Sequence, residues 1–151
     1  NATDSLWEAG NFQNVRAHGL EVSVDLDFRR LKGKDFWLRG LMASYNYISQ
    51  DMKQMENVQS RYVLEHIRNQ VILGIEHRIV SKLENSIKFR FIDRIDQSSY
   101  YLIDDRLSWV QNDHWRFFLE VTNLADVAYS EVMTPMPGRW VRGGLQFSID
   151  L

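Results

Sequence analysis

The feature that most constrains this chain is an alternation of apolar and polar residues that recurs along most of its length. In the segment GLEVSVDLDFRRL, residues 19–31, every second residue from Leu20 to Phe28 is apolar and those between them are polar. Side chains of a β-strand point alternately to the two faces of a sheet, so a period of two predicts a strand with one apolar and one polar face. The chain ends in the same way, with apolar residues at Val141, Leu145, Phe147, Ile149 and Leu151.

Seven segments of this kind follow one another and predict an all-β, antiparallel fold. They are residues 19–31, 36–49, 69–79, 86–93, 100–110, 115–124 and 141–151. Short turns are expected after Leu31, Val80 and Val110, and longer loops at residues 49–62, 93–99 and 129–138. Tight turns at one end and longer loops at the other are typical of outer-membrane β-barrels. No linker interrupts the series, so residues 1–151 are expected to be one unit, a segment of an antiparallel transmembrane β-barrel.

The second segment, FWLRGLMASYNYIS, can be placed on the sheet in two phases. One phase exposes Gly40, Ser44 and Asn46 on the apolar face, and the other gathers there Trp37, Arg39, Leu41, Ala43, Tyr45 and Tyr47. An Arg near a membrane interface costs about 0 to 1 kcal/mol, against roughly 2 to 4 kcal/mol at the midplane. We adopt the second arrangement because Arg39 is close to the turn, and because aromatic residues then lie at both rims of the apolar face.

The polar face carries many formal charges, namely Glu21, Asp25, Asp27, Arg29, Glu76, Arg78, Lys88, Arg90, Arg106, Arg116 and Glu120. Burying an unpaired ion costs several kcal/mol, so a small packed core cannot hold so many of them. This face therefore needs water or a polar plug. Asp105 interrupts the apolar face, whereas its neighbour Asp104 falls on the polar face, where Arg90 or Arg106 is expected to pair with it.

Composition excludes several classes of protein. The 18 basic and 20 acidic residues create no single-sign field that would favour nucleic acid. Cysteine is absent, which excludes disulfides, thiolate metal sites and cysteine catalysis. The sequence has no apolar run long enough for a transmembrane helix, and its polar start is not an intact signal peptide. A transmembrane β-strand needs only about 9 to 11 residues with one apolar face, so a bilayer is still open as a partner.

The residue pattern predicts no metal centre, no cofactor and no enzyme. The histidines lack the spacing of metal ligands, and they are His18, His66, His77 and His114. His77 falls in an apolar series and is expected to replace an aromatic residue at the rim. Asp104 and Asp105 are adjacent on a strand and point to opposite faces, which is wrong for two carboxylates that share a substrate.

A membrane hydrolase would need a serine close to His114. Ser108 and Ser130 are the candidates, but Ser130 and His114 fall at opposite ends of the expected topology. The sequence also contains no Gly-x-Ser-x-Gly motif. We therefore expect no catalytic residues.

Four short motifs carry a resemblance to a known family. Gly19-Leu20-Glu21 begins the first strand, Tyr45-x-Tyr47 precedes the longest loop, and Asn123-Leu124-x-Asp126-x-x-Tyr129 is followed by Pro137-Gly138-Arg139-Trp140 and the last strand. With these motifs the chain resembles the TonB-dependent outer-membrane receptors, in the C-terminal segment of their β-barrel. One departure is Leu151, because members of that family usually end on an aromatic residue. Taken alone, residues 123–129 also fit a strand end with Asx-turn chemistry.

The resemblance implies a 22-stranded barrel of which this chain holds about seven strands, with the lumen closed by a plug domain. The plug and the earlier strands are not in this sequence, so the chain is expected to be a C-terminal fragment or one chain of a cleaved receptor. Implied partners are the outer-membrane bilayer, the remaining strands and plug of the same receptor, TonB through that plug, and the barrel assembly machinery through the last strand.

The implied function is energy-coupled uptake of a scarce nutrient, such as a siderophore, cobalamin, haem or a glycan, across the cell outer membrane. The ligand would bind at the outer loops. Candidate contacts in or beside those loops are Gln50, Asp51, Arg61, Tyr100, Met133, Arg139 and Trp140. In Asn123 to Tyr129 and in the Met-Pro-rich loop, a purely structural turn is an equally good explanation.

Two alternatives are left open by the sequence. A self-contained eight-stranded outer-membrane barrel with a structural or adhesive role would need a further strand between Asn1 and Asn11. A soluble ligand-binding barrel of lipocalin type would turn the apolar face inward, with Arg39 and Asp105 inside it. Contact of the apolar face with lipid separates the soluble barrel from the other two, and a plug domain upstream in the gene separates the receptor from the small barrel.

Overall fold

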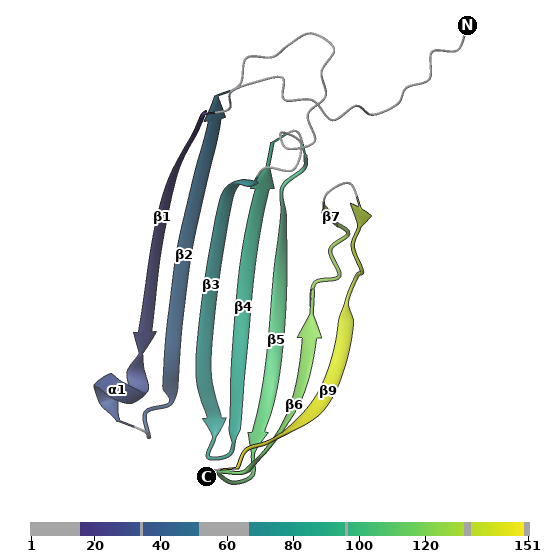
Figure 1. Cartoon of the computed structure of the whole chain (residues 1–151). Coiled ribbons are helices and arrows are strands. Elements are labelled where there is room, and N and C mark those ends of the chain that lie inside the picture. The colour runs from purple at the N-terminus through teal and green to yellow at the C-terminus, as the bar shows by residue number, and fades with distance from the viewer. Residues whose placement is uncertain (1–15, 34, 52–66, 96, 132–133, 150–151) are drawn as a thin grey trace, which may run out of the picture.

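The computed structural model describes residues 16–33, 35–51, 67–95, 97–131 and 134–149. Within these ranges the chain forms one short helix and nine strands, and Figure 1 shows the long strands side by side. They are β1 (Arg16–Asp27), α1 (Phe28–Lys32), β2 (Leu38–Asp51), β3 (Ile67–Val80), β4 (Leu83–Arg94), β5 (Tyr100–Val110), β6 (Trp115–Thr122), β7 (Ser130–Glu131), β8 (Thr134–Pro135) and β9 (Trp140–Phe147). None of the described helical residues forms a segment long and apolar enough to span a bilayer.

Seven strands form one antiparallel sheet in the order β1-β2-β3-β4-β5-β6-β9, which confirms the expected all-β antiparallel fold. Consecutive strands are neighbours, and β7 pairs with β8 in a separate two-stranded hairpin between β6 and β9. Within the described residues the sheet is open, because β1 and β9 each have one edge without a neighbouring strand.

The cross-strand register gathers residues of like polarity on each face of the sheet. On one face, Leu26 pairs with Leu41, which pairs with Ile75 and through it with Ile87. On the other face, Glu76 pairs with Ser86, which continues to Arg106, Glu120 and Arg142. The sequence alternation is therefore a real separation of an apolar face from a polar face, as in an amphipathic sheet.

The first strand is shorter than expected, because a helix replaces its last residues. β1 ends at Asp27, whose Oδ1 accepts a hydrogen bond from the backbone N–H of Arg29 at 2.9 Å and caps the N-terminus of α1. Gly33 ends the helix with φ of 93°, a conformation that favours glycine. The prediction that Phe28 and Arg29 continue the alternation of β1 is wrong, since both lie in this helix.

Other strand ends also differ from the sequence prediction. β4 begins at Leu83 rather than Ser86, and β2 continues through Ser49 to Asp51. At the end of the chain β9 stops at Phe147, so the prediction of a strand that continues to Leu151 is wrong. Ser148 still contacts the neighbouring turn, since its N–H donates to the His114 carbonyl at 2.9 Å. Asp150 and Leu151 lie outside the described residues.

Arg39 lies on the polar face, and its expected place on the apolar face is wrong. Leu38 pairs with His77 and Gly40 with Glu76, so Arg39 is the extra residue of a β-bulge. A bulge changes the direction of a side chain, and here Arg39 is buried with its Nη2 3.5 Å from Oε1 of Glu84. The apolar face consequently carries no arginine at this position.

Candidate functional site

The apolar face of the sheet is largely uncovered. Leu20 on β1 is 56% exposed and Leu145 on β9 is 62% exposed, although both are aliphatic. Further exposed residues on this face are Val22, Val24, Leu73, Ile87, Phe117, Leu119 and Val141. A contiguous apolar surface that follows six or more strands marks a contact with a protein or a membrane.

Aromatic residues lie along both ends of this face. At the end with short turns, Trp115 packs on Phe147 with ring centroids 4.6 Å apart, and His77 packs edge-on against Trp37 at 6.4 Å. Trp109 also lies at this end, and its Nε1 donates to Gln111 at 3.0 Å. The opposite end carries Tyr45, Tyr47 and Tyr101. His77 thus packs against a rim tryptophan, as its place in the apolar series predicted.

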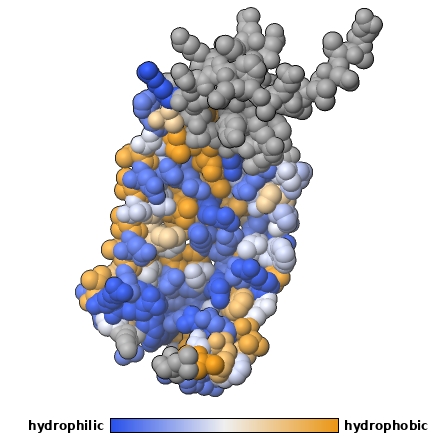
Figure 2. Space-filling model, viewed as in Figure 1, coloured by the Kyte–Doolittle hydropathy of each residue, from blue (hydrophilic) through white to orange (hydrophobic). Residues whose placement is uncertain are grey.

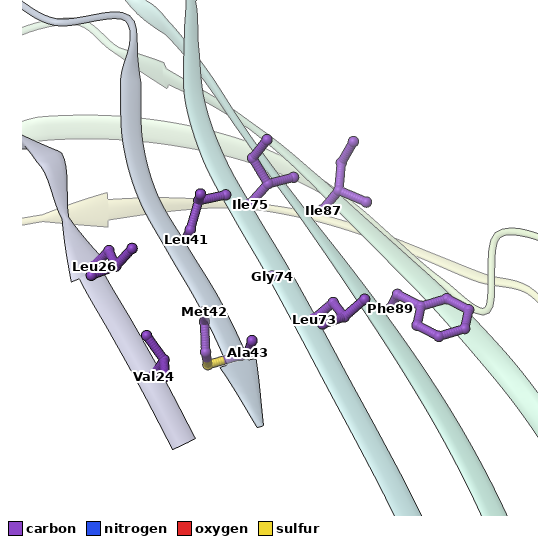
Figure 3. Close-up of a pocket in the computed structure, with 10 residues that line it drawn as sticks. All are labelled: Val24, Leu26, Leu41, Met42, Ala43, Leu73, Gly74, Ile75, Ile87 and Phe89. Atoms are coloured by element: carbon purple, nitrogen blue, oxygen red, sulfur yellow. The ribbon is translucent and has the colours of Figure 1, made fainter. Parts of the chain in front are cut away.

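An apolar depression of about 430 Å³ lies between these two rows of aromatic residues. Its lining comes from β1, β2, β3 and β4, and Figure 3 shows the residues: Val24, Leu26, Leu41, Met42, Ala43, Leu73, Gly74, Ile75, Ile87 and Phe89. Ala43 is the small residue in the cross-strand row from Val24 to Leu73 and Phe89. The depression offers aliphatic contact and no charged group.

The polar face is organised around two glutamates, each placed between two arginines. Glu84 lies 3.5 Å from Arg39 and 3.8 Å from Arg116. Glu120 lies 2.7 Å from Arg142 and 3.5 Å from Arg106. In Figure 2 hydrophilic residues gather over the centre and lower half of the molecule in view, with hydrophobic residues along its sides. The pairs of Glu120 join neighbouring strands, whereas those of Glu84 reach across an intervening strand on each side.

One aromatic residue also lies among these charges. The guanidinium carbon of Arg106 lies 4.1 Å from the centre of the Phe118 ring. On the neighbouring strand Gly144 faces the same ring, and a Cβ at Gly144 would lie 2.6 Å from Cζ of Phe118. A side chain at this position would therefore require the Phe118 ring to move.

Asn123 ends β6 with a set of hydrogen bonds at 3% exposure. Its Nδ2 donates to the Val127 carbonyl and its Oδ1 accepts from the Val127 N–H, each at 2.9 Å. Its own N–H donates to Oδ1 of Asp104 at 3.0 Å, and Oδ2 of Asp104 pairs with Arg90 at 2.8 Å. Of the two expected partners of Asp104, Arg90 is the one found. The Asn-Leu-x-Asp motif thus forms a corner that Asx chemistry explains.

The chain after this corner covers the polar face near the loop end. There Ile92, Tyr100 and Leu102 form the buried hydrophobic cluster, with Val127 and Tyr129 packed against it. The Tyr129 ring lies 4.8 Å from that of Tyr100, whose hydroxyl donates to Glu131 at 3.1 Å. Burial, and next to it the charge of Glu131, raises the pKa of the Tyr129 hydroxyl. The segment is therefore packed against the polar face of the sheet.

The Pro-Gly-Arg motif closes the base of the loop that carries β7 and β8. The N–H of Arg139 donates to Oδ1 of Asp126 at 2.7 Å, and its Nε donates to the Leu124 carbonyl at 3.0 Å. A Cβ at Gly138 would lie 2.6 Å from the same Asp126 oxygen. Asp126 itself has φ of 55°. Two of the four motifs that carry the family resemblance therefore contact one another.

The predicted ligand contacts divide into three groups. Arg61 and Met133 lie outside the described residues, and of Gln50 and Asp51 only the backbone is described, at the loop end of β2. Tyr100 is 8% exposed beneath Tyr129. Arg139 is held by the corner, whereas Trp140 is 62% exposed and pairs with Thr122 on the polar face rather than at the apolar rim.

The structure adds residues that the sequence reasoning did not single out. Asn85 is 7% exposed on the apolar face, where its Nδ2 donates to Oδ1 of Asp105 at 2.6 Å. Glu84 links Arg39 and Arg116, which lie on different strands and far from one another in the sequence. The sequence could have indicated Asn85, because it is a polar residue in an apolar series. It could not have indicated the contacts of Glu84, because these depend on how the strands pair.

Among the described residues no three His, Cys, Asp or Glu side chains gather as a metal site would require. Comparison of the chain with protein-family models, with curated proteins and with solved structures found no match. The site is therefore defined by the two faces of the sheet and by the corner at Asn123.

Proposed function

We propose that this chain is part of the wall of a transmembrane β-barrel that belongs to an outer-membrane receptor for energy-coupled nutrient uptake. One observation carries the membrane part of the proposal: a single-layer sheet whose exposed face is apolar across its whole width and whose other face holds an ion-pair network. In a barrel the first face contacts lipid and the second lines the interior.

The two rows of aromatic residues support this orientation. Trp109 and Tyr101 lie on the same strand at opposite ends of the apolar face. The rise of an extended strand separates them by about 27 Å, and an inclination of 35–45° reduces this to about 20 Å along the membrane normal. The apolar band of outer-membrane barrels is about 25 Å tall and is bounded by aromatic girdles.

The open edges of β1 and β9 support the presence of further strands. Unpaired N–H and C=O groups in hydrocarbon cost several kcal/mol each, so a sheet in a bilayer must close. Seven strands with two open edges therefore fit a larger barrel better than a complete one. The proposed receptor therefore requires further strands that complete the barrel and a plug in its lumen.

The receptor assignment itself is supported by the motif resemblance. The paired Asn-Leu-x-Asp and Pro-Gly-Arg motifs, together with the Gly19 and Tyr45 motifs, resemble those of TonB-dependent receptors. The ligand would be a siderophore, cobalamin, haem or a glycan, bound at the loop end and released inward when the plug moves. Trp140 and the backbone at Gln50 and Asp51 lie at this end.

Fluorescence quenching in liposomes tests the orientation. Two variants of the full-length protein are made. In each, either Trp109 or Trp140 is the single tryptophan left within this chain. Because Trp109 lies on the apolar face and Trp140 on the polar face, brominated lipids should quench Trp109 at least about twofold more strongly. Equal quenching of both, or a protein that is monomeric and soluble without detergent, would overturn the membrane proposal.

Growth on single nutrients tests the receptor assignment. Deletion of the gene should abolish growth at limiting concentrations of one of the four nutrients, and the full-length gene should restore it. Normal uptake of all four by the deletion strain would contradict the assignment while leaving the barrel in place.

The structure removes one of the two objections to a soluble lipocalin-type barrel and keeps the other. Arg39 no longer counts against it, since it lies on the polar face. Asp105 would still be enclosed with the apolar side chains. The segment from Asn1 to Asn11, on which the eight-stranded alternative depends, lies outside the described residues.

A further inference from the structure

The helix α1 between β1 and β2 has no part in the proposed function so far. Figure 1 shows it beyond the ends of these two strands, whose last paired residues are Asp27 and Gly40. Leu31 in this helix is 65% exposed, and Trp37 after it is also exposed, although both are large and apolar. The short-turn end of the sheet therefore presents apolar side chains on an element that lies outside the sheet.

A series of aromatic rings fixes α1 at the level of the aromatic row at this end. The ring of Phe28 in α1 lies 5.9 Å from that of Phe36, which lies 6.2 Å from Trp37. Trp37 in turn lies 6.4 Å from His77 on β3. Aromatic rows of membrane proteins lie at the level of the lipid headgroups. In the proposed barrel α1 is consequently at headgroup level.

The same helix carries an excess of positive charge. Arg30 has a side chain that is 88% exposed, and Lys32 is exposed as well. Asp27 is shared between two arginines, since its carboxylate oxygens lie 3.1 Å from Nε of Arg29 and 3.5 Å from Nε of Arg30. Ion pairs this exposed contribute little. The other described acid of this turn, Asp35, pairs with an arginine of β3.

We infer that α1 binds the headgroup of an acidic phospholipid, an inference that rests on the proposed membrane location. Basic residues beside Trp, Phe and Leu are typical of helices that lie in a membrane interface and bind anionic lipids. Arg30 and Lys32 contact the acidic headgroup, and Leu31 and Trp37 contact the first part of the acyl chains. The apolar surface continues from there into the depression, because Leu26 at the end of β1 is part of its lining.

Charge and depth together select an acidic lipid as the occupant. Each Lys or Arg close to an anionic membrane surface strengthens binding about fivefold. A zwitterionic lipid lacks the net charge for this gain. A free anion such as inorganic phosphate has the charge, but it leaves Leu31 and Trp37 in water. An acidic lipid satisfies the cations and the apolar side chains at once.

Fluorescence quenching of Trp37 in the full-length protein tests this contact. Liposomes of phosphatidylcholine contain a minor fraction of brominated lipid, either phosphatidylglycerol or phosphatidylcholine with the same brominated chains. A Trp37→Phe variant gives the contribution of all other tryptophans, which is subtracted. Brominated phosphatidylglycerol should quench Trp37 at least about threefold more strongly than brominated phosphatidylcholine. Equal quenching by the two lipids would overturn the inference.

Substitution of the cations locates the preference. Arg30→Gln combined with Lys32→Gln should reduce the threefold difference to less than about 1.5-fold. Lys82→Gln is the matched control, because Lys82 is an exposed basic residue in the turn between β3 and β4 at the same end. It should leave the difference unchanged. A difference that survives the double substitution, or that Lys82→Gln removes equally, contradicts binding at α1.

Two further measurements distinguish the remaining explanations. Inorganic phosphate in excess over the lipid, at constant ionic strength, should leave the preference in place, and its loss would assign the cations to a free anion instead. Quenching of Trp109 is measured in the same liposomes. If Trp109 is quenched and Trp37 shows no preference, this inference alone is contradicted. If neither tryptophan is quenched, the proposed function is contradicted as well.

Discussion

The centre of the sheet and its two edges obtain their stability from different surroundings. On β4 and β5, Ile92 and Leu102 are 3% and 1% exposed because the chain after Asn123 folds back over them. On β1 and β9 nearly every residue is exposed on both faces. The hydrogen bonds between backbones are equally regular in both regions.

This contrast shows which part of the sheet is packed by this chain alone. The centre has protein on its polar face and ion pairs nearby, whereas both faces of β1 and β9 are exposed. Loss of a central side chain should therefore leave a cavity that nothing else fills. At the membrane location proposed above, loss of an edge side chain should be compensated in part by lipid, since acyl chains are as apolar as leucine.

The largest difference between the two regions is expected for leucine truncation. Leu102→Ala should lower the free energy of unfolding by about 3 to 4 kcal/mol, because it removes a buried side chain and leaves a cavity. Leu145→Ala on β9 should cost only about 1 to 2 kcal/mol, since lipid replaces the lost contact. Urea titration of the full-length protein in detergent micelles measures both, and equal losses would remove the distinction.

A smaller loss is expected at the corner that covers the centre. Asn123→Ala removes the reciprocal bonds to Val127 and should cost about 2 to 3 kcal/mol. Asn112→Ala is the matched control, since its Oδ1 accepts from the N–H groups of His114 and Trp115 in an exposed turn. That change should cost about 1 kcal/mol. The same urea titration measures both losses of stability. A loss for Asn112→Ala as large as that for Asn123→Ala would argue against a special role for the corner.

The smallest loss is expected at the glycine pair of the edge strand. Gly144→Ala should cost about 1 to 3 kcal/mol, because its Cβ would lie 2.6 Å from Phe118 and push the ring against Arg106. Gly143→Ala meets nothing nearer than 3.6 Å and should change stability by less than about 0.5 kcal/mol. Two variants of equal stability would show that Phe118 can move at no cost.

Much of this arrangement could be predicted from the sequence. A period of two decides which side chains share a face, so the apolar series of β1, β4 and β5 and the place of Asp105 were predictable. The place of Arg39 on the polar face could not be predicted, because a bulge adds one residue to a strand without changing its composition. The helix after Asp27 was missed because Phe28 continues the alternation while Asp27 already caps the next element.

The candidate site was predicted less well, since its contacts join distant parts of the chain. Asn123 and Asp126 were noted as a motif, but their partners Asp104 and Arg139 are brought to them only by folding. Tyr100 resembles an accessible loop residue in the sequence, and Tyr129 covers it. Side-chain periodicity describes one strand at a time. It contains no information on contacts between residues that are far apart in the sequence.

The bond between Asp126 and the backbone of Arg139 has a consequence for how this sheet can diversify. It joins the segments that lead from β6 into β7 and from β8 into β9 where they leave the sheet. Substitutions within the hairpin would then not disturb the strands below it. The hairpin is thus a place where the sequence can vary while the register of the seven-stranded sheet stays the same.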